Sequence, residues 1–78
     1  MERHDLDLIE RLAPDYPELV QLMEQHRDYE RSLAPLAVAR WLSPEEEAEE
    51  RRLKRLKLVG RDRIESILTA HRQEHAQV

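Results

Sequence analysis

The hydrophobic residues of this chain recur three and four positions apart in three separate segments, which is the pattern of amphipathic helices. The first segment covers residues 5–13 and places Leu8, Ile9 and Leu12 on one face. It ends at the stretch APDYP, where two prolines disrupt helical geometry. A helix this short needs a partner surface to stay folded. We therefore predict a short N-terminal helix that docks on the rest of the chain.

The second segment, residues 17–41, begins at Pro17, a favourable first residue for a helix. His26 fills a gap in its apolar series, which otherwise consists of Leu19, Leu22, Met23, Tyr29, Leu33, Leu36 and Ala37. These spacings predict a long helix with a heptad-like seam. Pro35 lies inside it, withholds one amide donor and crowds the carbonyl of Arg31, so we predict a kink or short break near Pro35.

The third segment opens with the motif SPEEE, in which Ser43 and Glu46 have the spacing of a capping box. Its acidic run also suits the positive end of a helix. We predict a helix over residues 44–71, followed by a tail over 72–78. Its seam consists of Leu53, Leu56, Gly60, Ile64, Ile67 and Leu68. Inside a helix, glycine lowers stability by about 1 kcal/mol relative to alanine. We explain Gly60 by a close approach of the two long helices, with Tyr29 or Met23 opposite it.

Two long helices joined by a short turn predict an all-α fold: an antiparallel helical hairpin with a short N-terminal helix, forming one domain over residues 1–78. The expected core is Leu19, Leu22, Leu33, Leu36, Leu53, Leu56, Ile64 and Ile67. A chain of 78 residues buries a marginal core, and it has no cysteine for disulfides. We therefore predict that oligomerisation completes a helical bundle, so that the chain is a homo-oligomer of coiled-coil character.

Charge is unevenly distributed along a chain whose net charge is −4. Residues 43–50 carry five acidic and no basic residues, whereas residues 51–63 carry seven basic residues and one acidic residue. The seven, called the basic stripe below, are Arg51, Arg52, Lys54, Arg55, Lys57, Arg61 and Arg63. The stripe is either a solvated face paired with acidic neighbours or a site for an anionic partner. We favour the first alternative, the solvated face. The negative net charge and the scarcity of aromatic residues for base stacking disfavour nucleic acid as the partner.

Residue patterns typical of catalysis or cofactor binding are missing from the sequence. It has no cysteine, no Gly-rich phosphate loop and no Ser–His–Asp arrangement, so we predict no enzyme, no cofactor and no metal. His71 and His75 are four apart and could share a metal, yet no third ligand has a matching spacing. For His26 we prefer a polar seam residue that sets helix register over a catalytic role. The sequence has neither a signal-peptide pattern nor an apolar stretch long enough to cross a bilayer, so we expect a cytoplasmic protein without membrane insertion.

The order of these patterns resembles the YdcH-like family of small bacterial proteins, which have a domain of unknown function. The resemblance covers roughly residues 16–68. The family pattern has a proline-led first helix with a His three before a Leu and seven before an Ile. Its second helix carries a Leu-Lys-x-x-Lys-Leu run and a later basic-Asp-x-Ile. The corresponding positions in this chain are His26, Tyr29, Leu33, Leu53, Lys54, Lys57, Leu58, Arg61, Asp62 and Ile64. Tyr29 and Gly60 depart from the family pattern, in which leucine is commoner. The resemblance implies a self-associating hairpin without known catalytic activity, and we expect a function through self-association and protein–protein interaction.

Overall fold

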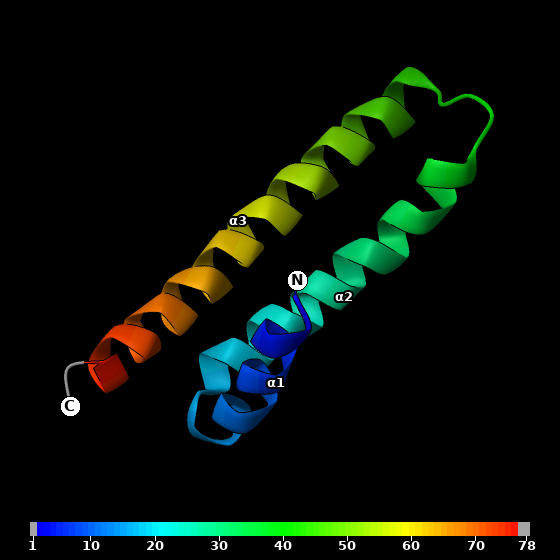
Figure 1. Ribbon diagram of the computed structural model, residues 1–78. Coiled ribbons are helices and arrows are strands. Elements are labelled where there is room, and N and C mark those ends of the chain that lie inside the picture. The colour runs from blue at the N-terminus through cyan, green and yellow to red at the C-terminus, as the bar shows by residue number, and fades with distance from the viewer. Residues whose placement is uncertain (1, 77–78) are drawn as a thin grey trace.

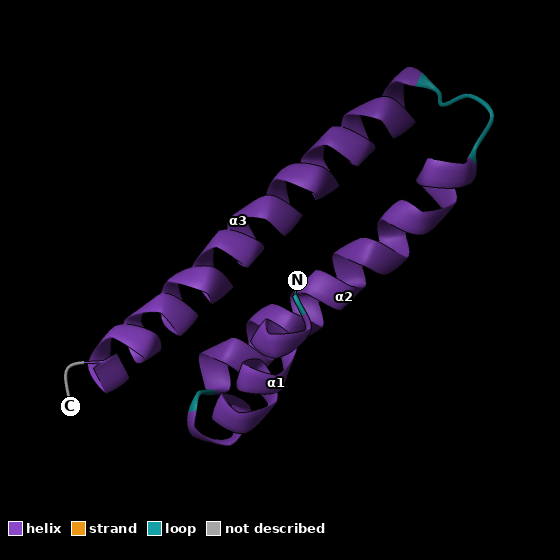
Figure 2. Ribbon diagram, viewed as in Figure 1, coloured by secondary structure: helices purple, strands orange, loops and turns teal. Residues whose placement is uncertain are grey.

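The computed structural model describes residues 2–76, with side chains up to Glu74. It contains helix α1 (Arg3–Leu12), a 3-10 turn η1 (Ala13–Asp15), helix α2 (Pro17–Val38) and helix α3 (Pro44–Ala76). No strand occurs within residues 2–76 (Figure 2). Helices α2 and α3 run antiparallel side by side, and α1 packs at the end of this hairpin away from the α2–α3 turn (Figure 1). The predicted all-helical hairpin is therefore confirmed, and the molecule is elongated, measuring 53 × 20 × 16 Å.

The start of α3 is stabilised by the predicted capping box. The amide of Glu46 donates to the hydroxyl oxygen of Ser43 at 3.1 Å, and the amide of Ser43 donates to Oε1 of Glu46 at 3.0 Å. Two backbone donors that a helix start leaves without partners are thereby satisfied. The prediction of this helix start from the sequence is confirmed.

Helix α2 passes through Pro35 without a break and ends at Val38, three residues before the predicted end at Trp41. A proline withholds a single amide donor, and the helix continues for less than one further turn beyond it. Of the two alternatives predicted near Pro35, a kink or a short break, the break is absent. Helix α3 extends to Ala76, so most of the segment expected as a tail is helical.

The hydrophobic core is concentrated at the end of the hairpin that α1 covers. Its buried cluster consists of Ile9, Leu12, Leu19, Ile64 and Leu68. Of the remaining expected core residues, Leu53 is also buried, Leu22 and Ile67 pack against the cluster, and Leu33, Leu36 and Leu56 are half-buried. The expected core is therefore confirmed at Leu19, Leu53 and Ile64, whereas its other five residues are only partly buried. Two helices leave one side of their seam open, so most seam residues beyond the reach of α1 stay half-buried.

Gly60 does not mark a close approach of two helices. A Cβ atom added at this position would have no neighbouring atom within 4 Å. The side chains of Tyr29 and Met23 therefore do not press against it, and the explanation offered from the sequence was wrong. The backbone there is ordinary helix without a positive φ, so the geometry leaves room for alanine.

Candidate functional site

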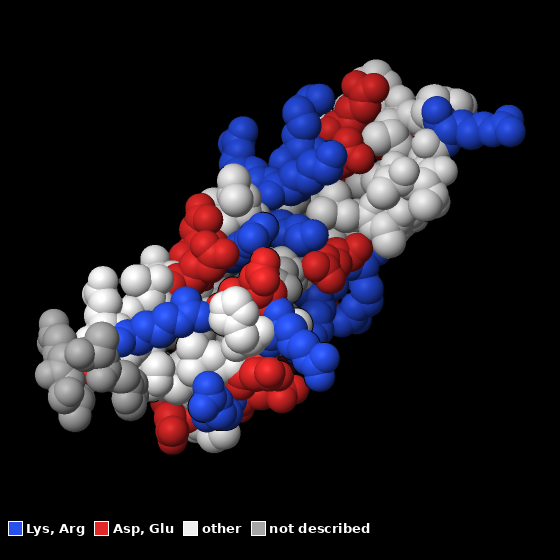
Figure 3. Space-filling view, viewed as in Figure 1, with Lys and Arg blue, Asp and Glu red and all other residues white. Residues whose placement is uncertain are grey.

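The basic stripe lies on α3, and six of its seven members are exposed while Lys57 is half-buried. Figure 3 shows blue basic side chains gathered over the first half of α3, with red acidic side chains beside them. The arrangement follows from the sequence, since one continuous helix presents the acidic first turn and the basic run one after the other.

Five members of the stripe form ion pairs with nearby carboxylates. Within α3 these are Arg52–Glu49 at 2.6 Å, Lys54–Glu50 at 3.6 Å and Arg61–Glu65 at 3.3 Å. The two pairs that cross to α2 are Lys57–Glu30 at 3.4 Å and the two-point contact between Arg63 and Glu18, at 2.5 and 3.1 Å. Most of the stripe is thus neutralised locally, as the interpretation of a solvated face requires.

Two members of the stripe, Arg51 and Arg55, have no hydrogen bond or ion pair among the described residues. A spacing of four residues along a helix favours ion pairs of Glu47 with Arg51 and of Glu50 with Lys54. The second pair is present, whereas the first is not formed. Exposed pairs of this kind are worth less than about 1 kcal/mol and compete with hydration, so helical spacing alone did not ensure the contact.

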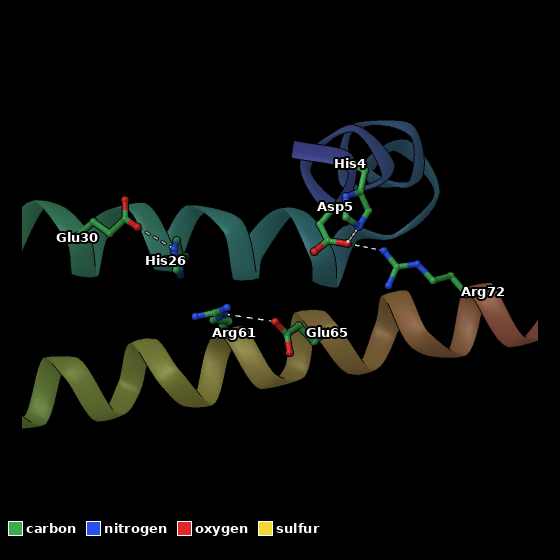
Figure 4. A network of polar contacts seen from close by, with 7 residues as sticks. All are labelled: His4, Asp5, His26, Glu30, Arg61, Glu65 and Arg72. Atoms are coloured by element: carbon green, nitrogen blue, oxygen red, sulfur yellow. Dashed lines mark hydrogen bonds and ion pairs between the residues drawn. The ribbon is translucent and has the colours of Figure 1, made fainter. Parts of the chain in front are cut away.

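The ion pairs between helices lower the pKa of their carboxyl groups. The hydrogen bonds from Arg63 hold the pKa of Glu18 below its ordinary value, and the hydrogen bond from Arg72 does the same for the pKa of Asp5. Figure 4 shows the second contact, which joins Asp5 on α1 to Arg72 near the end of α3. Each contact links two helices of the chain and adds to the apolar packing between them.

We expect these carboxylates to make folding stability depend on pH. Their pKa values are lower in the folded state, so the unfolded chain takes up protons first as the pH falls. Their stabilisation is present above the ordinary carboxyl pKa of about 4, and it is lost as the pH falls through the lowered values. Glu18→Gln should therefore flatten the acid side of the stability curve, measured by urea unfolding over a pH series. The control is Glu24→Gln, because Glu24 is exposed on α2 and forms no ion pair with any residue that the structure describes. Equal acid slopes in wild type and Glu18→Gln would contradict the expectation.

His26 lies on α2 with 13% of its side chain exposed, and its Nε2 is 2.9 Å from Oε1 of Glu30 (Figure 4). Its Nδ1 is buried and has no hydrogen-bond partner within the described part of the chain. Burial raises the pKa of Glu30, but the neighbouring His26 and Lys57 outweigh it, so that the pKa of Glu30 is lowered overall. Glu30 thus joins His26 on its own helix to Lys57 on α3, an arrangement consistent with setting the register of the two helices.

The remaining expectations about sites concern metals and membranes. The side chain of His75 lies outside the described residues, so its pairing with His71 stays a sequence observation. Among the described residues, no group of three or more His, Cys, Asp or Glu side chains could hold a metal ion. Within residues 2–76, none of the helices combines the length and apolar character needed to span a membrane.

Comparison with protein-family models finds no match to this chain, and comparisons with curated proteins and with solved structures likewise find none. The fold and the charged face define the chain only as a small helical hairpin with a third helix at one end. The resemblance to the YdcH-like family rests on its sequence pattern and stays a prediction.

Proposed function

We propose that this protein is a non-enzymatic cytoplasmic helical protein that acts through self-association and protein–protein interaction. The observation that carries the proposal is the surface that one chain leaves uncovered. Its accessible surface is 6161 Å², whereas a compact monomer of 9.4 kDa exposes about 5,000 Å². The excess, on the order of 1,000 Å², is comparable with the roughly 800 Å² that each partner covers in a standard stable interface.

The shape of the chain and its exposed apolar residues support the same proposal. Its radius of gyration is 15.4 Å, against about 11.5 Å for a compact domain of this length. At the end of the hairpin that α1 does not cover, Val38 and Trp41 are 84% and 78% exposed. The family resemblance of residues 16–68 also implies self-association.

A second candidate function is binding of an anionic partner. The observation that favours it is that Arg51 and Arg55 have no polar partner in the part of the chain that the structure describes. They lie on successive turns of α3 and both are exposed. Five paired neighbours and a net charge of −4 weigh against this alternative.

Analytical ultracentrifugation over a range of protein concentrations tests the proposal. We expect a mass of at least two chains that falls towards one chain on dilution. A single-chain mass at every concentration would contradict self-association. Adding a short anionic oligonucleotide at low and high salt tests the alternative, since a monomer that binds it only at low salt would make the basic stripe the functional site.

A further inference from the structure

The outer face of α3 is the side opposite its buried residues, and at its centre lie Arg55, Leu58, Val59 and Asp62. The buried residues of this helix include Leu53, Ile64 and Leu68, whereas Leu58 and Val59 are 57% and 60% exposed. Single exposed apolar residues are common on monomers. Here two adjacent ones lie in the middle of the longest helix, between two charges of opposite sign.

Those two charges, Arg55 and Asp62, are exposed and make no hydrogen bond or ion pair among the described residues. They are seven residues apart, which is close to two helical turns, so they share one face. The same spacing puts them about 10 Å apart along the helix axis, too far for a contact within the chain. In this they differ from Lys57 and Arg63, which reach carboxylates on α2.

We propose that α3 pairs antiparallel with α3 of a second copy of this chain through the outer face. This inference rests on the proposed function and specifies its interface. In a two-fold interface, residue i meets residue j and residue j meets residue i. If the two-fold axis passes between Leu58 and Val59, Arg55 of each copy lies opposite Asp62 of the other. The apolar pair then packs against its own symmetry mate at the centre, flanked by two identical ion pairs.

The residues further along the outer face fit this register. Ala48 lies opposite Thr69, and Arg51 lies opposite Ser66, so three of these four flanking side chains are small. Small side chains favour the 8–10 Å separation of packed helix axes. All four are exposed in the single chain. The contact would cover the part of α3 that neither α1 nor α2 covers, and it accounts for part of the excess surface.

Reversing charge tests this register. In Arg55→Asp, two acidic side chains face each other at both symmetric positions, and in Asp62→Arg two arginines do. Each single variant should raise the dimer dissociation constant roughly tenfold or more, because two contacts change from attraction to repulsion. The double variant Arg55→Asp/Asp62→Arg should restore the wild-type constant. An equimolar mixture of the two single variants should form a heterodimer, since both of its contacts are then attractive.

The measurement is analytical ultracentrifugation at low ionic strength, with helix content checked by circular dichroism. Arg27→Asp is the matched control, because Arg27 is exposed on α2 and has no ion pair among the described residues. Its dimer dissociation constant should equal that of the wild type. If the wild type self-associates and neither single variant weakens it, the outer face is the wrong interface, while the proposed function stands. If the wild type is a monomer at every concentration, both proposals fail.

Discussion

Ile64→Ala should lower the free energy of unfolding by about 2–5 kcal/mol, the range for removing a fully buried aliphatic side chain. Ile64 is 0% exposed and lies in the cluster where all three helices meet. A small domain of this size rarely draws more than about 3–5 kcal/mol from its core. The substitution should therefore leave a large unfolded fraction at room temperature, seen as loss of helical circular dichroism and a lower urea midpoint.

Val38→Ala is the control for this substitution, because Val38 is 84% exposed and outside the core. We expect it to change stability by no more than about 0.5 kcal/mol. All samples should be compared at one protein concentration, since self-association would add to apparent stability. A loss below about 1 kcal/mol for Ile64→Ala would mean that the core is not where the three helices meet.

Ile9→Asp should detach α1 from the hairpin. Ile9 is 5% exposed, and with Leu12 it joins α1 to the buried cluster. A charge placed there has no partner and loses its hydration, so we expect a cost of roughly 3 kcal/mol or more. A free helix of ten residues is marginal in water. Hydrogen exchange should therefore show α1 amides losing protection, together with the α3 amides near Leu68 that α1 covers.

Leu6→Asp is the matched control on the same helix, because Leu6 is 42% exposed and lies outside the buried cluster. It introduces the same charge into α1 while leaving the docking contact in place. We expect α1 protection close to that of the wild type. Equal loss of protection in both variants would show that helix propensity rather than docking determines whether α1 is folded.

The local features of this fold could be predicted from the sequence because they depend on neighbouring residues. The capping box of Ser43 and Glu46 is complete within four residues, and its hydrogen bonds formed as predicted. The Glu50–Lys54 contact likewise needs only one helical turn. Apolar periodicity gave the helical segments, although the end of α2 at Val38 and the extension of α3 to Ala76 were missed.

The candidate site was harder to predict, since its properties depend on which helices meet. Periodicity placed Leu58 off the seam. It could not show that Arg63 contacts Glu18 on α2, whereas Arg55 contacts no carboxylate of the described residues. Both are exposed arginines within one basic run. Only the position of α2 beside one edge of α3 separates a paired charge from an unpaired one.

By itself the sequence determined an all-helical chain, the start of its longest helix and which side of each helix is apolar. These follow from hydrogen bonding and side-chain spacing over a few residues. The tertiary structure decided that the core gathers beneath α1 and that Gly60 is not at a helix contact. It also decided that Arg55 and Asp62 have no polar partner among residues 2–74. Those outcomes depend on distances between segments far apart in the chain, and periodicity shows that a face is apolar without showing what covers it.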